Sequence, residues 1–518
     1  ERLLLSTNPI RSVDADAFVA VSPLRHLHLD ATELTLLPDR AFAGLARLSE
    51  LVLSGSRLQA VKRCTLCGGL ASLRTLLLND NQVSSIESGA FDQLIALTTL
   101  DLSGNCLLRL EPVSLFARQS SLVKLSCDHN LLSEASFSPV LFAPLRYSLA
   151  YLSLSGNSGV KELRAHQFAR LAALYQLDLS SSRIARLHSD CFAGLAALRQ
   201  LDLSRNRIAS LNRSLNSFRA LTNLDLSDNA LERLSSADFA QLAVLGGLRL
   251  SNNPIRLVDV PTAGSLTFIK LLRLSLSNTS TELVAAFNLT SLRDLETLDL
   301  SHNDLYPVRD SLMTLPTRVL RQLTLRRANL SFSLAFLDRL VGLNELDLSE
   351  NPELDLATMR YICSVQDLKS ARLAGIGLTN EAIERYDFLV AGGAESSVFA
   401  SASDHLDLSR NGLSVIRARY DMFNLQLSSL NFSRNQLEVI EAGAFGRIFR
   451  TFYTLDLSHN RLRVFDSEAL FLKGTVFLES VFLQGNRLEW MHVPVESQLN
   501  LRQLCLAHNQ LTSAPLSN

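Results

Sequence analysis

Apolar and polar residues alternate along this chain in a pattern that returns about every 25 residues. Each copy reads L-x-x-L-x-L-x-x-N-x-L, where x is variable, and the Asn position can be followed from Asn8 to Asn509. A chance match would not stay in phase over a whole chain, so internal repetition is the first constraint on the fold. Clear copies lie at 73–83, 97–107, 198–208, 221–231, 295–305, 343–353, 427–437 and 501–511.

The x-L-x-L stretch of each copy predicts a short β-strand, because apolar and variable residues alternate in it with a period of two. One such strand cannot bury its own apolar side, so the copies must stack on one another. Stacking gives a parallel sheet with strands roughly 4.8 Å apart, with the leucines in the core and the variable residues facing out. We therefore expect a single continuous array over residues 1–518.

Two further columns complete the predicted core. The Asn that follows each strand is expected to bond the backbone of adjacent coils, since a buried turn must satisfy its polar groups. A Phe about ten residues after the Asn is expected to pack as a second spine on the other side. Phe residues at this spacing are Phe18, Phe42, Phe91, Phe192, Phe239 and Phe445, with Phe168 one residue later.

The repeat with its added Phe resembles the typical animal subtype of extracellular leucine-rich repeat proteins, over essentially the whole chain. The resemblance implies an α/β solenoid, a horseshoe or arc of about 21 coils with a parallel concave β-sheet and an irregular or 3-10 convex side. Long uninterrupted arrays resemble chaoptin-type adhesion proteins and Toll-type receptor ectodomains. Insect Toll arrays often carry internal cysteine-rich caps; their absence from this sequence favours an adhesion role.

The longest break in phase separates Ile376 from Asn411, which lie 35 residues apart. Segment 384–403 is therefore predicted to protrude as a loop, and such insertions often lie on a binding side; a longer convex helix is the alternative. Neither end has the cysteine-rich flank usual in the resembled family. We expect any signal peptide, membrane anchor or signalling domain to lie outside these residues, although unusual terminal coils would also fit.

Charge and hydropathy narrow the classes of partner. The chain has 50 Lys and Arg against 51 Asp and Glu, a net charge of −1. A nucleic-acid binder needs a basic surface to displace counterions, so nucleic acid is not an expected partner. No run of about 18 uninterrupted apolar residues predicts a membrane-spanning helix, so membrane attachment would use segments outside this sequence.

Cysteines and glycosylation signals bear on the compartment. Cys64 and Cys67 could form a local disulfide, but no second pair stands at metal-binding spacing. Cys127 takes a core Leu position, and Cys505 takes an outward position on a strand. N-x-S/T signals support the secretory pathway, and sugar on Asn431 would cover part of the sheet. These signals are at Asn212, Asn278, Asn288, Asn329 and Asn431.

No motif for catalysis is recognisable: there is no nucleophile elbow, phosphate loop, zinc-protease helix or calcium loop. We therefore predict neither enzymatic activity nor a cofactor. Asp178, Asp202 and Asp225 occupy the same position in consecutive copies, and such a row could raise a carboxyl pKa or attract a cation. A solvated acidic row is the favoured interpretation, because Asp is common at this position of the repeat.

The remaining function is recognition by a rigid surface, which loses little conformational entropy on binding. Departures from Asp and Ser on the predicted concave face are the candidate contacts, since Tyr and Arg are enriched in binding hot spots. These candidates are His26, His28, Glu50, Tyr151, Tyr175, Arg199, Arg249, Arg273, Arg321, Arg372 and Phe482.

These observations predict an extracellular or cell-surface ectodomain that binds a protein ligand or a second copy of itself, in cell adhesion or chaoptin-like recognition. Families of this kind commonly form dimers. The alternatives are a Toll-like innate-immune receptor ectodomain, a soluble extracellular immune or matrix factor, and an intracellular scaffold.

Overall fold

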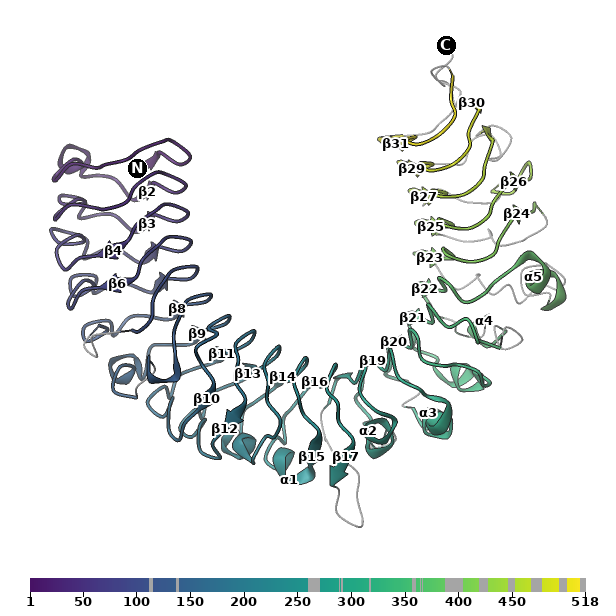
Figure 1. The fold of residues 1–518 in the computed structure, drawn as a ribbon, viewed down its shortest axis with the longest axis horizontal. Coiled ribbons are helices and arrows are strands. Elements are labelled where there is room, and N and C mark those ends of the chain that lie inside the picture. The colour runs from purple at the N-terminus through teal and green to yellow at the C-terminus, as the bar shows by residue number, and fades with distance from the viewer. Residues whose placement is uncertain are drawn as a thin grey trace. The chain divides into compact units, whose positions relative to one another are not determined.

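The computed structural model describes most of the chain, in two compact units, Glu1–Leu271 and Leu272–Asn518 (Figure 1). Each unit is built from stacked coils. The prediction of one continuous array is not tested by this division and stays a prediction. The described residues are 1–110, 115–136, 139–259, 271–287, 289, 292–315, 318–355, 360–363, 365, 367–386, 404–418, 427–445, 452–466, 478–492 and 501–512.

In unit 1, short strands pair in parallel, each with the strand of the next coil, as the repeat predicts. The strands lie on the inner side of the curve of this unit (Figure 1), which we call its concave face. They are β1 (Arg2–Leu4), β2 (His26–His28), β3 (Glu50–Val52), β5 (Thr75–Leu77), β7 (Thr99–Asp101), β8 (Lys124–Ser126), β9 (Tyr151–Ser153), β11 (Gln176–Asp178), β13 (Gln200–Asp202), β14 (Asn223–Asp225) and β16 (Gly247–Arg249).

Unit 2 repeats the same parallel pairing, again with its strands on the inner side of its own curve. Its strands are β18 (Arg273–Ser275), β19 (Thr297–Asp299), β20 (Gln322–Thr324), β21 (Glu345–Asp347), β22 (Ser370–Arg372), β23 (His405–Asp407), β25 (Ser429–Asn431), β27 (Thr454–Asp456), β29 (Ser480–Phe482) and β31 (Gln503–Cys505). The predicted α/β solenoid with a parallel sheet is confirmed.

The outer side of each unit carries short, varied elements, which confirms the expected irregular and 3-10 convex side. Two-residue and three-residue strands pair there as β4–β6 (Ala60–Val61, Ser85–Ile86), β10–β12 (Glu162–Leu163, Arg186–Leu187), β15–β17 (Arg233–Ser235, Leu257–Asp259), β24–β26 (Val415–Ile416, Val439–Ile440) and β28–β30 (Val464–Asp466, Trp490–His492). The α-helices are α1 (Ser236–Phe239), α2 (Thr281–Ala286), α3 (Arg309–Leu312), α4 (Arg360–Cys363) and α5 (Asn380–Tyr386). The 3-10 turns are η1 (Val19–Val21), η2 (Glu134–Ser136), η3 (Ala143–Leu145), η4 (Ser214–Ser217), η6 (Tyr306–Val308) and η7 (Ala335–Arg339).

The Asn column bonds the backbone of two coils, as expected. Asn206 Nδ2 donates to the carbonyl oxygen of Leu203 in its own coil (3.0 Å) and to that of Leu179 in the preceding coil (2.9 Å). Its Oδ1 accepts from the backbone N–H of Ile184 at 3.1 Å. The same arrangement recurs at Asn81, Asn105, Asn130, Asn229, Asn303, Asn411, Asn435 and Asn460.

The Phe spine is also present, and every Phe predicted for it is buried. In unit 1 the rings of Phe18 and Phe42 stack with centroids 6.0 Å apart. Phe142 and Phe218, which the spacing rule did not select, join the spine beside Phe168 (6.5 Å) and Phe192 (5.3 Å). Coils of unequal length still deliver an aromatic ring to the same place.

The predicted loop 384–403 is only partly within the described residues. Residues 384–386 form the last turn of α5, where Arg385 makes an ion pair with Glu381 (3.1 Å), and residues 387–403 lie outside the described part. The protruding loop therefore stays a prediction.

Candidate functional site

The concave face of each unit presents two parallel columns of side chains. In each x-L-x-L stretch the first x and the second x face out on either side of a buried Leu, and strand pairing aligns them with the same positions of the next coil. The repeat thus fixes where each side chain of these columns lies, while the type of side chain can differ from coil to coil. Departures from Asp and Ser in the columns define the candidate sites.

A histidine–glutamate cluster lies near the amino-terminal end of the unit 1 sheet. His26 Nδ1 lies 2.8 Å from Glu50 Oε2, and His28 Nε2 lies 3.9 Å from Glu50 Oε1. All three side chains are half-buried on the concave face. The structure therefore brings together three of the predicted contact residues.

A hollow of about 450 Å³ opens on the concave face at β8, β9 and β11. The hollow forms because two small side chains, Ser126 and Ser153, occupy adjacent positions of one column. In the neighbouring coils the same column position holds Asp101 and Asp178. The larger side chains of the other column rise beside these small serines. The lining residues are Lys124, Leu125, Ser126, Asp128, Tyr151, Leu152, Ser153 and Gln176.

Tyr151 lines this hollow, and Tyr175 lies beside Tyr151 outside the lining. The rings of Tyr151 and Tyr175 lie 6.0 Å apart with their planes inclined at 52°, and both side chains are exposed, by 42% and 37%. An exposed aromatic pair on a rigid sheet offers a large contact area at little entropic cost. Tyr151 in register with Lys124 places a cation and an aromatic side by side on adjacent strands.

Three predicted contacts lie at the beginning of the strands. Tyr175, Arg199 and Arg321 each precede a strand by one residue, at the amino-terminal edge of the sheet instead of its centre. There Arg321 Nη1 donates to the carbonyl oxygen of Gly342 (3.0 Å). The backbone N–H of each of these residues already bonds the preceding coil, for example Tyr175 N to Ala150 O (2.8 Å), and their role as concave-face contacts stays a prediction.

Asp128 closes the carboxyl-terminal side of the hollow, where the repeat usually has Ser. It accepts hydrogen bonds from Ser153 Oγ (2.5 Å) and from the backbone N–H of Ser155 (2.8 Å). Burial raises the pKa of the Asp128 carboxyl, with Asp178 and Asp101 adding to the rise, while the two hydrogen bonds oppose it. A cationic group that enters the hollow would stabilise the ionised carboxylate of Asp128, which burial and the neighbouring aspartates disfavour.

The acidic row predicted in unit 1 exists, with Asp178, Asp202 and Asp225 in register on β11, β13 and β14. These side chains are half-buried instead of fully solvated, and burial first, then the neighbouring aspartates, raises the pKa of Asp202. Arg249 on β16 ends the row by an ion pair with Asp225 Oδ2 (3.2 Å). The concave face of unit 1 is thus anionic beside the hollow.

The predicted contacts in unit 2 are dispersed. Arg273 is exposed on β18, and Phe482 is half-buried on β29 between Asp456 and Cys505. Arg372 lies in register between Asp347 and Asp407. Among the described residues they form no common cluster.

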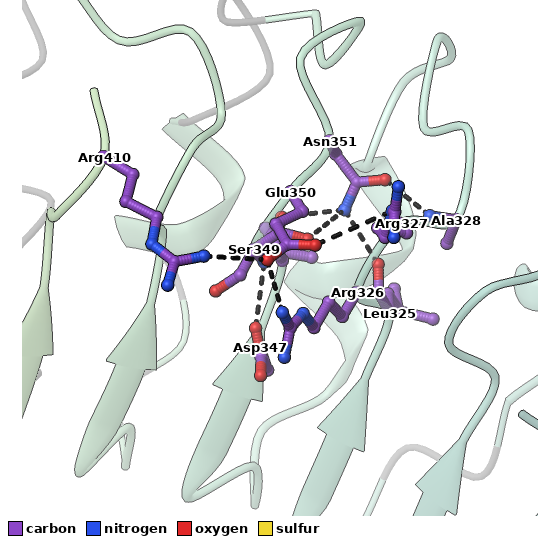
Figure 2. Close-up of polar contacts among 10 residues, drawn as sticks. Leu325, Arg326, Arg327, Ala328, Asp347, Ser349, Glu350, Asn351 and Arg410 are labelled. Atoms are coloured by element: carbon purple, nitrogen blue, oxygen red, sulfur yellow. Dashed lines mark hydrogen bonds and ion pairs between the residues drawn. The ribbon is translucent and has the colours of Figure 1, made fainter. Parts of the chain in front are cut away.

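A charged cluster that sequence reasoning missed surrounds Glu350, in the turn after β21 (Figure 2). Its carboxylate accepts a short hydrogen bond from Arg326, accepts from Arg410 Nη1 at 3.3 Å, and lies 3.6 Å from Arg327 Nε. These contacts, led by the Arg326 hydrogen bond, hold the pKa of Glu350 below its usual range. Three arginines around one carboxylate leave an excess of positive charge.

Arg410 reaches Glu350 across an intervening coil, since the two residues are 60 positions apart. The intervening coil presents Gly375 at φ +64°, and a Cβ there would lie 3.9 Å from both the Arg410 Cβ and the Glu350 Cα. A Cβ at that distance would make ordinary van der Waals contact, so the positive φ is the feature that favours glycine here.

The cysteines and sequons are placed as follows. Cys64 and Cys67 are half-buried unbonded thiols with Sγ atoms 2.8 Å apart, so a disulfide there stays a prediction. Cys127 is buried and Cys505 is half-exposed, as expected. Asn278 and Asn329 are exposed, Asn431 is half-buried on β25, Asn212 donates to the Leu187 carbonyl oxygen (3.1 Å), and Asn288 lies outside the described residues.

The sequence held a signal for each missed group. Asp128 and Arg326 both replace the Ser that usually follows the second Leu of the strand. The candidate contacts were selected from the strand positions only, so these two residues were missed. Within the described part of the chain, no group of three or more His, Cys, Asp or Glu residues is arranged to hold a metal ion. In that same part no helix has the length and apolar character needed to cross a membrane.

Comparison with known proteins bears on the family. The family described as "Leucine rich repeat" matches residues 1–58, 71–132 and 147–208. These stretches carry leucine-rich repeats, and the coils of both units have the leucine-rich repeat fold. The in-register coils, Asn column and Phe spine are the structural form of those repeats.

Relatives of this leucine-rich repeat chain include receptors. It is 30% identical to leucine-rich repeat-containing G-protein coupled receptor 5 of Rattus norvegicus over 30% of this chain and 19% of the receptor. It is 34% identical to podocan-like protein 1 of Homo sapiens over 34% and 32% of the two chains. It is 33% identical to Toll-like receptor 2 type-2 of Gallus gallus over 22% and 14%. The matches thus span less than a third of each of these relatives.

Among solved structures, an internalin of Listeria monocytogenes aligns with a TM-score of 0.46 and 19% identity. The alignment covers 67% of this chain and 86% of the internalin.

Proposed function

We propose that this leucine-rich repeat chain is a non-enzymatic, extracellular protein-recognition ectodomain. The observation that carries the proposal is the hollow on β8, β9 and β11, with Tyr151 and Lys124 on one side and the half-buried Asp128 on the other. The hollow lies on a rigid sheet next to the acidic row, so we expect a partner that presents a Lys or Arg side chain. Such a side chain would bond Asp128 and pack its stem on Tyr151.

An extracellular location is supported by the exposed sequons at Asn278 and Asn329 and by relatives whose names describe them as receptors. Membrane attachment would then be supplied by segments other than the described helices. A soluble extracellular factor has the same recognition surface, and an intracellular scaffold is the alternative that unglycosylated sequons would favour.

The same surface could serve in cell adhesion or in innate-immune recognition. Cell adhesion, in the manner of chaoptin-type proteins, would pair this chain with a second copy or another surface protein. The similarity to a Toll-like receptor supports the second candidate, an innate-immune receptor ectodomain. Cells displaying the chain would aggregate with one another under the first proposal and would not under the second.

The test is a binding screen of the multimerised chain against an array of extracellular proteins. We expect a bound protein whose signal is lost with Tyr151→Ala and reduced with Asp128→Asn. Tyr147→Ala is the matched control, because Tyr147 is 78% exposed and is not part of the hollow. A binder indifferent to Tyr151→Ala would contradict recognition at the hollow.

A further inference from the structure

A single column of loop residues runs along unit 2, directly before each Asn-column position. We call it the loop-edge column, because each member lies in the turn after the carboxyl end of a strand. Its members are Asn278, His302, Arg327, Glu350, Gly375, Arg410, Arg434, His459, Gly485 and His508.

All members of the loop-edge column share one backbone conformation. Every one has a positive φ in the left-handed region, from 50° at Arg327 to 71° at Gly485. From Asn278 to Gly485 each backbone N–H bonds the next coil: Arg410 N donates to Ser433 O (2.9 Å) and Arg434 N to Ser458 O (2.9 Å). Equal conformation on stacked coils makes the side chains leave the edge in one direction, as a row.

The row is basic. Arg327, Arg410 and Arg434 are exposed, and Arg326 adds a fourth guanidinium beside them. The carboxylate of Glu350 offsets one of these charges while holding the guanidinium groups of Arg326 and Arg410 by hydrogen bonds. An arginine side chain that a carboxylate already holds in place loses less conformational entropy when it binds a ligand.

The fold does not require this chemistry, as the equivalent column in unit 1 shows. That column has a single Arg, at 205, between Ser181 and Asp228 in the neighbouring coils, and Arg205 has the same conformation, with φ 53°. Its members are Thr7, Ala31, Gly55, Asp80, Gly104, His129, Gly156, Ser181, Arg205, Asp228 and Asn252. The concentration of arginines is specific to unit 2.

We propose that the loop-edge column of unit 2 binds a sulfated glycosaminoglycan chain. Sulfate oxygens accept paired hydrogen bonds from guanidinium groups, and strands roughly 4.8 Å apart place Arg327 and Arg434 about 20 Å from each other along a line. A linear polyanion matches such a row better than a compact anion does. The column contains no Phe, Tyr or Trp side chain on which a nucleic-acid base could stack.

The proposal goes beyond the proposed protein recognition, because it concerns another unit and another ligand. It is tested by surface binding of the whole chain to an immobilised heparin oligosaccharide at several salt concentrations. Arg410→Gln and Arg434→Gln are each expected to weaken binding about two- to fivefold, as for one exposed charge pair, and together about tenfold. Binding should also fall as salt rises.

Arg205→Gln is the matched control and should leave heparin binding unchanged, because it removes the same charge from the same backbone position in unit 1. An unchanged thermal unfolding midpoint shows that each variant is folded. Arg434→Gln also leaves the hydrogen bonds of the Glu350 cluster in place. Equal loss with Arg205→Gln, or no loss with the double variant, overturns the site. Equal binding of a desulfated oligosaccharide, polyglutamate or single-stranded DNA overturns the assignment to sulfate.

Discussion

At the scale of single residues, the Asn column is what closes the backbone of each coil. Asn206 is buried and connects Leu179, Ile184 and Leu203 through both atoms of its amide. No other side chain of that size both donates and accepts in this way. The polar column is therefore as much a part of the core as the leucines.

Replacing Asn206 with Ala is expected to destabilise the chain by at least about 2 kcal/mol, because buried carbonyl and N–H groups lose their partner. The midpoint of urea unfolding measures the change. Arg205→Ala, at the exposed neighbouring residue, serves as control and should alter stability by less than about 0.5 kcal/mol. Equal effects of the two substitutions would refute the role of the Asn column.

Asp128 gives a prediction about pH. Burial raises its pKa in the folded chain, so the folded state binds a proton more tightly than the unfolded state does. Stability should therefore fall as pH rises from the ordinary carboxyl value through the raised one. Asp128→Asn removes this contribution, so the variant should gain stability relative to the parent between about pH 4 and pH 7. Urea unfolding at both pH values tests the sign; a constant difference would contradict it.

At the scale of elements, strand register was predictable because every copy of the repeat is in phase. Leucine positions alone fix which side chains share a column, and Asp178, Asp202 and Asp225 align accordingly. The Phe spine was predicted only in part. Phe142 and Phe218 each follow their Asn by 12 residues, and the longer coil still brings the ring to the spine.

The candidate sites show where sequence reasoning ends. Tyr151 was selected by residue type, but the hollow beside it depends on Ser126 and Ser153 being small in adjacent coils. The Arg410–Glu350 contact joins residues two coils apart and passes beside Gly375 of the coil between them. Such contacts depend on side-chain reach across coils, which a repeat pattern does not encode.

Phe192→Ala should cost about 3–5 kcal/mol, since it removes a buried ring that packs on Phe218. The cost should be read from unfolding at constant pH and salt. Phe192→Leu, which keeps much of the apolar volume, should cost markedly less. A cost for Phe192→Ala below about 1 kcal/mol would remove the spine from the core.

The turn that holds Cys64 and Cys67 supports a redox prediction. Their Sγ atoms are close enough for a disulfide after a small shift, and we expect that bond in chain secreted from an oxidising compartment. Burial, then the Cys64 contact, raises the pKa of Cys67 to about 11, so unassisted oxidation at neutral pH should be slow.

Alkylation before reduction measures the state of these thiols. In secreted chain Cys64 and Cys67 should resist the reagent until a reductant is added, while the exposed Cys106 reacts at once. Immediate labelling of all three would show that no bond forms.

At the scale of the whole molecule, a net charge of −1 conceals two opposite surfaces. Unit 1 presents an acidic row on its sheet, and unit 2 presents a basic row along its turns. Neither would be recognised from composition, because each depends on which position of the repeat carries the charge. A class of binding partner that net charge alone excludes should therefore be judged again from the charges at each position of the repeat.

Glycosylation tests the proposed location. Chain made in a secretory host should carry sugar on Asn431 and on at least two other sequons, with Asn278 and Asn329 favoured by their exposure. Asn212 is exposed as well, and its amide nitrogen donates to Leu187 O as that of Asn329 donates to Asp304 Oδ1, so these two sites should be occupied alike. Mass spectrometry of glycopeptides measures each site, and five unmodified sequons would remove the extracellular proposal.

The left-handed turn before each Asn has an evolutionary consequence. Arg, His, Glu, Asp, Ser and Gly all occupy it with nearly the same backbone geometry, while the leucines and asparagines around it do the folding. Exchange of one exposed side chain for another at this place therefore leaves the leucine and asparagine contacts of the core unchanged, so the charge of this edge can differ from coil to coil on one scaffold.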